Sequence, residues 1–193
     1  MPVDRNDLAM RIAAAKPSDT SRGLNFNTVF KLAAELLGEA EAKKLDPQGK
    51  GGRVDFFSYP IADYLAITWD AADRLEERVG SPEAVFQELG RRTITGFLAS
   101  MLGKTIFAMA GRDPRRVIAS GPAGYRSAVS YGERKVEFLG ARSARMTFEH
   151  DFMPAIFHSM VIETALKSTE ARNVRVAARD TGFLSSEYRI DWE

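Results

Sequence analysis

The sequence contains no cysteine and only two histidines, both in its last quarter. Without thiols the chain has no disulfide, no thiolate metal ligand and no cysteine nucleophile, a usage that is common in cytoplasmic proteins. The scarcity of histidine confines any imidazole chemistry to the neighbourhood of His150 and His158.

The chain also lacks a strong charge of either sign and a long apolar run. Its 27 basic and 26 acidic side chains leave a formal net charge of +1, which gives no electrostatic reason to expect a nucleic-acid partner. The most apolar stretch, residues 94–110, contains Lys104 and is shorter than the ~20 residues of a membrane span. The first residues resemble no signal peptide. We therefore expect a cytoplasmic protein without a membrane span.

Strand patterns dominate the last third of the chain. Over residues 134–138, Val136 and Phe138 alternate with charged residues. The same alternation recurs over residues 145–149, 172–178 and 187–192. A period of two predicts antiparallel strands with one face on a core and one in water.

Helical patterns dominate the first 120 residues. Apolar residues at helical spacing predict helices over residues 4–16, 26–44 and 61–79. Ser81 followed by Pro82 predicts the N-cap and first position of another helix, and Asp113 followed by Pro114 predicts a shorter one that ends near Ser120. Residues 121–124 (GPAG) predict a turn that leads into the sheet.

Residues 94–110 are apolar on nearly every face and predict a buried central helix. Gly103 would bend this helix or permit close packing. Its bulky and adaptable side chains are typical of ordinary core packing, and the alternative is that they form one wall of an apolar pocket against the sheet. The candidate pocket residues are Phe97, Met101, Phe107 and Met109.

These segments predict one α+β domain over residues 1–193. Its helical part covers residues 4–120 and its sheet part residues 125–192. Strands are expected over residues 127–140, 143–150, 172–180 and 186–192, with a helix over residues 154–169 that covers the sheet.

Four blocks carry a resemblance to a known family: residues 17–27 (PSDTSRGLNFN), 89–104, 131–140 and the closing EYRIDW. They resemble short paralogous proteins that occur in many copies in myxobacteria, a family of unknown function. That family is similar in turn to a superfamily of heme–nitric-oxide-binding domains, 4-vinyl-reductase-type domains and small subunits of TRAPP vesicle-tethering complexes.

The resemblance implies helices packed on one face of a twisted antiparallel sheet of four or five strands. Some of these relatives hold a small apolar ligand between helices and sheet, and others dimerise as scaffolds. The gas-sensing relatives bind heme through a histidine before the sheet and a Y-x-S-x-R motif. This chain has no histidine before His150, and Val129 stands where Tyr125 and Ser127 would require an arginine. We therefore expect no histidine-ligated heme and no other cofactor.

Two further groups of side chains are candidate sites. His150 and His158, with Glu149 and Asp151, offer nitrogen and oxygen ligands, but their spacing matches no recognised metal motif, so we expect no metal. Basic side chains around residue 113 could hold an anion, with solvated surface charge as the alternative. These are Arg112, Arg115 and Arg116.

No nucleophile motif such as G-x-S-x-G occurs, so we do not expect an enzyme. Two functions remain open, and an enzyme acting on a bound ligand ranks third. The first is a scaffold that forms a homodimer or binds a paralogous protein, which an exposed apolar helix face would favour. The second is a sensor or carrier of a small apolar ligand, which an enclosed cavity would favour.

Overall fold

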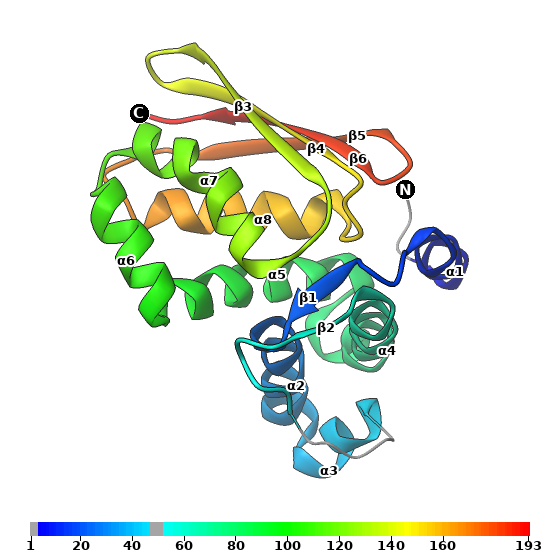
Figure 1. Cartoon of the computed structure of the whole chain (residues 1–193). Coiled ribbons are helices and arrows are strands. Elements are labelled where there is room, and N and C mark those ends of the chain that lie inside the picture. Colours follow the sequence, from blue (N-terminus) through cyan, green and yellow to red (C-terminus); the bar gives the residue numbers. More distant parts are fainter. Residues whose placement is uncertain (1–3, 47–51) are drawn as a thin grey trace.

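A computed structural model describes residues 4–46 and 52–193 of the chain. A four-stranded sheet forms one layer, and the helices lie on one face of it, with α8 nearest to the strands (Figure 1). The predicted α+β architecture, with helices on an antiparallel sheet, is confirmed.

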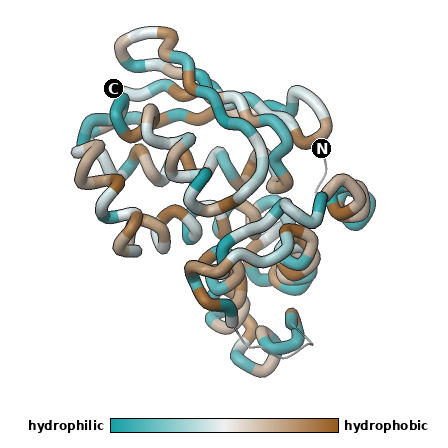
Figure 2. The backbone as a smooth tube through the Cα atoms, in the orientation of Figure 1, coloured by the Kyte–Doolittle hydropathy of each residue, from teal (hydrophilic) through white to brown (hydrophobic). Residues whose placement is uncertain are grey.

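The sheet is antiparallel throughout, with the strand order β3-β4-β6-β5. Along β4, Ala144, Met146 and Phe148 face the helices and are buried, while hydrophilic and hydrophobic residues interleave along the strands (Figure 2). The strands are β3 (Glu133–Gly140), β4 (Ser143–Glu149), β5 (Arg175–Gly182) and β6 (Ser185–Asp191).

A second, two-stranded sheet was not expected from the sequence. Strand β1 (Thr20–Arg22) pairs with β2 (Ser58–Pro60), and an isolated bridge joins Ser21 to Val129. Strands of three residues are too short to show a period of two. Together these pairings tie the start of the chain to the segment before the main sheet.

Most helices begin where the sequence predicts. The Ser81 hydroxyl accepts a hydrogen bond from the Ala84 N–H at 3.2 Å, and the Asp113 carboxylate accepts one from the Arg115 N–H at 2.9 Å. The helices are α1 (Arg5–Ala14), α2 (Gly23–Leu37), α3 (Glu39–Ala42), α4 (Ile61–Val79), α5 (Pro82–Ala99), α6 (Met101–Ala110), α7 (Pro114–Ala128) and α8 (Ala155–Lys167). The helix predicted over residues 26–44 instead ends at Gly38, whose φ of +92° is left-handed backbone that favours glycine.

The prediction of one buried helix over residues 94–110 is wrong. Ser100 ends α5 and caps α6 through the Gly103 N–H at 3.1 Å, and the two helix axes differ in direction by 84°. A Cβ atom on Gly103 would lie 1.9 Å from the carbonyl oxygen of Phe97, so this tight corner excludes a side chain there. Among the described helices, no single one is long and apolar enough to cross a membrane. Helices α5 and α6 have the necessary length and apolar composition only when they are taken together across their bend.

The turn predicted at residues 121–124 is also wrong, because this segment lies inside α7. A Cβ atom on Gly121 would lie 3.2 Å from the methyl group of Met146, so the glycine allows α7 to lie close to the sheet. Tertiary packing therefore outweighs the local helix-breaking tendency of Gly121 and Pro122. As a result, the first long strand begins at Glu133 rather than near residue 127.

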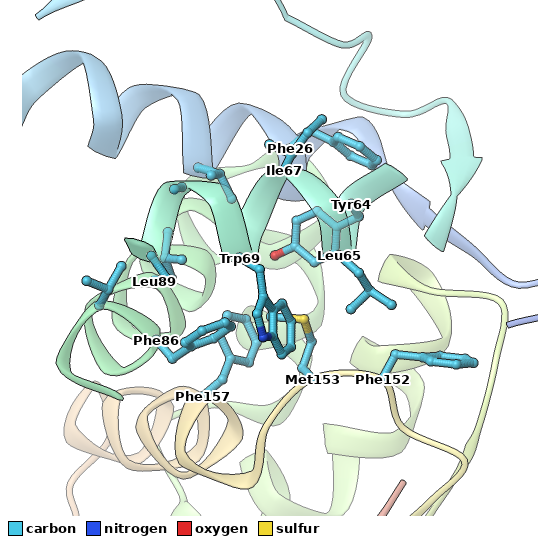
Figure 3. Close-up of a cluster of buried hydrophobic side chains, with 14 of the residues drawn as sticks. Phe26, Tyr64, Leu65, Ile67, Trp69, Phe86, Leu89, Phe152, Met153 and Phe157 are labelled. Carbon is cyan, nitrogen blue, oxygen red and sulfur yellow. The ribbon is translucent and has the colours of Figure 1, made fainter. Parts of the chain in front are cut away.

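Two separate hydrophobic cores hold these layers together. The first lies among α1, α2, α4 and α5, where the ring of Trp69 meets that of Phe86 at a centroid distance of 4.7 Å (Figure 3). The second lies between the sheet, α7 and α8. Helix α8 contributes to both, with Phe157 in the first core and Leu166 in the second.

Candidate functional site

A cavity of about 310 Å³ lies between the two cores. Its walls come from α5, α6, α7, α8 and strand β4, and they are mostly apolar. Representative wall residues are Ile94, Phe97, Phe107, Ile118, Met146 and Ile162. The lining also includes Phe56 and Leu102, which are 71% and 44% exposed, so the cavity reaches the surface. Its volume and apolar lining are typical of a site for one small molecule, since such pockets measure ~300–1,000 Å³.

Three polar side chains, Tyr125, Arg134 and His158, also line the cavity and are joined through Asp151. The Tyr125 hydroxyl lies 3.1 Å from Nδ1 of His158, and Nε2 of His158 lies 2.8 Å from Oδ1 of Asp151. The Arg134 guanidinium donates to Oδ2 of Asp151 and to the carbonyl oxygen of Tyr131. The side chains of Arg134 and Asp151 are each only 2% exposed, so this is a buried ion pair.

The Asp151 carboxylate is the electrostatic centre of this network. Burial alone would raise its pKa, but His158 and Arg134, together with hydrogen bonds from the His158 ring and the Met153 N–H, hold the pKa well below its ordinary value. Asp151 therefore stays ionised, and it anchors α8 through His158 and strand β3 through Arg134.

The Tyr125 hydroxyl is suited to hydrogen bonding rather than to nucleophilic chemistry. Burial raises its pKa far above the ordinary value, and the negative charge of Asp151 adds to that shift. The phenol therefore stays protonated. When the His158 ring is neutral, Nε2–H donates to Asp151 and Nδ1 accepts from Tyr125, which still leaves the phenol oxygen able to accept one more hydrogen bond.

Two buried polar atoms on residues of the cavity lining have no hydrogen-bond partner within residues 4–46 and 52–193. They are Nε of Arg134 and Oγ1 of Thr93. The Arg134 guanidinium also lies over the rings of Tyr125, Tyr131 and Phe148 at 5.2–5.5 Å, which compensates part of its charge without satisfying the Nε–H.

The structure divides the predicted pocket residues into two pairs. Phe97 and Phe107 lie on the cavity wall. Met101 and Met109 are 83% and 79% exposed on the outer face of α6, so their placement in the pocket is corrected. The bend at Ser100 turns these two methionines away from the sheet.

The three arginines predicted to hold an anion do not converge. Arg115 donates to the carbonyl oxygens of Gly140 and Ala141, and its guanidinium lies 4.0 Å from the ring centroid of Phe138, so it ties α7 to the β3–β4 hairpin. Arg116 is exposed beside Asp113, and Arg112 is exposed at the end of the preceding turn. The Asp113 carboxylate itself occupies the start of α7. Anion binding at this position stays a prediction.

The two histidines point to different parts of the molecule. Nε2 of His150 lies 3.3 Å from the carboxylate of Asp19, outside the cavity, whereas His158 belongs to the network described above. Across the described ranges, no three histidine or carboxylate side chains gather in a way that could hold a metal ion.

The sequence singles out most members of the buried network without connecting them. His158 and Asp151 are candidate metal ligands there, and Tyr125 is part of the string compared with the heme motif. The missed signal lies in strand β3, where Arg134 shares a face with Val136 and Phe138. An arginine on the core face of a strand requires a buried partner, and Asp151 is that partner.

Comparisons with known proteins agree on the fold. The model of a family described as a protein of unknown function, DUF2378, matches residues 14–193. No curated protein matches the sequence. The solved H-NOX protein of S. oneidensis in its Fe(II)NO state has a TM-score of 0.71 at 12% identity, over 89% of this chain and 99% of that chain. The unliganded Fe(II) H-NOX protein of K. algicida has a TM-score of 0.69 at 14% identity, over 89% and 96%.

The residues of the cavity do not fit an iron centre ligated by histidine. His158 is the one histidine in the cavity lining, and both of its ring nitrogens already have hydrogen-bond partners. Iron binds the lone pair of a ring nitrogen. Here Nε2 carries the proton that it donates to Asp151, and the lone pair of Nδ1 accepts the hydrogen bond from Tyr125. The Tyr125 hydroxyl is likewise engaged with the His158 ring, and burial raises its pKa. The fold is that of H-NOX proteins, but the donor set is different.

Proposed function

Since this chain belongs to the DUF2378 family of unknown function and has the fold of the H-NOX proteins, we propose that it is a non-enzymatic module that binds one small, largely apolar molecule. The bound molecule would occupy the cavity between the two cores. As a sensor or carrier, the protein would use this cavity without iron ligated by histidine.

The cavity is the observation that carries this proposal. Its volume suits a small molecule, and most of its wall surface is apolar even though several polar side chains take part in the lining. A fully packed core would leave no void of this size, because protein interiors have few voids larger than a water molecule. The buried ionisable groups bond mainly to one another, which supports binding rather than catalysis.

Native mass spectrometry of freshly purified, untagged protein tests the proposal. We expect a discrete excess mass that disappears on denaturation. A chain with no excess mass should still show raised thermal stability when apolar probe molecules are added, since a ligand that binds only the folded state stabilises it. Neither an excess mass nor any stabilisation by a broad apolar panel would contradict ligand binding.

A pair of glycine substitutions places the ligand. Gly124 lines the cavity, Gly96 does not, and an added Cβ atom at either position would meet nothing within 4 Å. We expect Gly124→Leu to fill part of the cavity and reduce probe affinity by about tenfold or more, the size of effect that one lost side-chain contact can produce. Gly96→Leu is the matched control and should bind as the unaltered protein does. If the two variants bind the probe with equal affinity, the probe binds outside this cavity.

A second candidate function rests on the exposed apolar face of α6. Met101, Leu102 and Met109 are 83%, 44% and 79% exposed on this helix, which lies at the periphery of the molecule (Figure 1). Exposed apolar clusters commonly mark protein–protein contacts. We therefore propose, as the alternative, a scaffold that forms a homodimer or binds a paralogous protein through α6.

The oligomeric state decides this alternative. In light scattering coupled to gel filtration, a dimer through α6 should dissociate when Met101→Lys and Met109→Lys are combined, because charge at a dry contact is unfavourable. Substitution of the exposed Phe183, at the far end of the β5–β6 hairpin, with lysine provides the control. A monomer at every concentration would exclude the homodimer.

A further inference from the structure

The polar part of the cavity wall indicates which chemical groups the bound molecule carries. The Arg134 side chain is 2% exposed and lines the cavity, yet only its two terminal nitrogens have partners. Its Nε is one of two buried side-chain nitrogen or oxygen atoms without a hydrogen bond in the described ranges. Buried polar groups in folded proteins are almost always paired, so an unpaired donor on a cavity wall indicates an acceptor on whatever fills the cavity.

The charge of the same network restricts that acceptor. Asp151 already neutralises Arg134, and both oxygens of Asp151 are in use: Oδ1 accepts from His158 and from the Met153 N–H, and Oδ2 accepts from Arg134. A ligand carboxylate beside Arg134 would add a second negative charge next to a guanidinium that Asp151 already neutralises. The other arginine of the lining, Arg22, is accompanied there by Asp55, so the wall offers no net positive charge to offset that carboxylate. A buried charge without a partner is strongly unfavourable, whereas a neutral oxygen meets the needs of the Nε–H without that penalty.

From these two observations we propose that the ligand is a neutral, largely apolar carbonyl compound, such as a ketone, aldehyde or ester, whose oxygen accepts a hydrogen bond from Nε of Arg134. This inference rests on the proposed function and specifies its ligand class. The apolar part of the molecule lies along α5, α6 and α8, and the carbonyl group lies toward the start of β3.

Three probes of equal chain length test the ligand class on the unaltered protein. They are an aliphatic methyl ketone, the alkene in which a methylene group replaces the carbonyl oxygen, and the corresponding carboxylic acid. Calorimetry is carried out at about pH 8, well above the ordinary carboxyl pKa of ~4, so that the acid is ionised. We expect the ketone to bind about tenfold or more tightly than either of the others, as a hydrogen bond from a charged donor would produce.

The outcomes separate this inference from the proposed function. If none of the three probes binds while other molecules of the apolar panel raise thermal stability, only the ligand class is overturned. If no molecule of the panel does so and no excess mass is found, the proposed function fails with it. If ketone and alkene bind equally, the cavity binds apolar molecules and only the assignment of a carbonyl ligand is overturned. Tighter binding of the carboxylate would also overturn that assignment, in favour of an anionic ligand.

Two variants then locate the acceptor. In the combined variant Arg134→Met with Asp151→Asn, both charges are removed together, so neither is left buried alone. We expect this variant to bind ketone and alkene with similar affinity, while alkene binding shows that the cavity is intact. Thr93→Val removes the other unpaired atom from the same wall with little change in shape and should keep the preference for the ketone. Loss of the preference in Thr93→Val, with its retention in the double variant, would assign the anchor to Thr93 instead.

Discussion

At the scale of single residues, one carboxylate connects three parts of the fold. Asp151 follows strand β4, holds the guanidinium of Arg134 on β3, and accepts from His158 on α8. A buried ion pair contributes little net stability compared with apolar residues of the same shape, but removal of one partner leaves the other charge without compensation. The network therefore specifies how sheet and helix meet more than it strengthens their contact.

Asp151→Asn should lower the free energy of unfolding by ~3–5 kcal/mol, because Arg134 is then buried without a counter-charge. Denaturation in urea measures this change. As a control, Asp191→Asn disrupts only the exposed contact with Arg189 and should change stability by less than ~1 kcal/mol. Similar effects for the two variants would mean that Arg134 reaches solvent when Asp151 is neutral.

The same carboxylate makes stability depend on pH at the acid end. The pKa of Asp151 is lower in the folded chain than its ordinary value of 3.8, so its contribution is fully present above that value and is lost as the pH falls toward the folded pKa. We expect the midpoint of urea denaturation to decrease as the pH drops below ~4. In Asp151→Asn the midpoint of urea denaturation should decrease less over the same pH range, because the titrating carboxylate is absent. An unchanged slope would assign acid sensitivity to other carboxylates.

At the scale of elements, the crossing of α5 over α8 depends on one glycine. A Cβ atom on Gly90 would lie 2.2 Å from the carbonyl oxygen of Phe157, so the two helices approach each other closely only because position 90 has no side chain. This crossing fixes the distance between two walls of the cavity, since Ile94 and Phe97 continue along α5 and Ile162 along α8.

Gly90→Ala should therefore destabilise the protein by ~1–3 kcal/mol, the usual range for overpacking, even though alanine favours a helix. Gly96→Ala lies in the same helix with open space around its Cβ atom, and it should be neutral or stabilising by up to ~1 kcal/mol. Thermal unfolding of both variants measures the difference. If both substitutions raise the thermal stability, α5 and α8 can move apart at Gly90 without loss of stability.

The elements also show which features a sequence can reveal. Strands β4 and β6 and helix α4 follow directly from apolar periodicity, because one face of each is buried. The Ser100 corner does not, since a serine between two apolar stretches gives a weak local signal and only the packing of Gly103 on Phe97 specifies the bend. The sequence offers a pocket between residues 94–110 and the sheet as one of two interpretations, and of its four residues Phe97 and Phe107 lie on the cavity wall. The polar anchor depends on the meeting of residues far apart in sequence, such as Tyr125 and His158.

At the scale of the whole molecule, the two cores are joined through α8 and through Tyr125 of α7, and the cavity lies between them. Regions with separate cores often open separately in native-state hydrogen exchange. We expect backbone amides of α2 and α4 to exchange with a different opening free energy from those of β4 and β6. A saturating ligand in the cavity should bring the two values closer, because it contacts both cores. Identical protection with and without ligand would indicate that the chain already unfolds as one unit.

Helix α6 has two faces with different neighbours. Phe107 and Ile106 on one face line the cavity, while Met101 and Met109 on the other face solvent. A ligand in the cavity and a protein bound to the outer face would therefore both contact α6, which is joined to α5 through the bend at Ser100. Thermodynamic linkage makes such effects reciprocal: by whatever factor an occupant changes the affinity of the outer face, a partner on that face changes the affinity for the occupant.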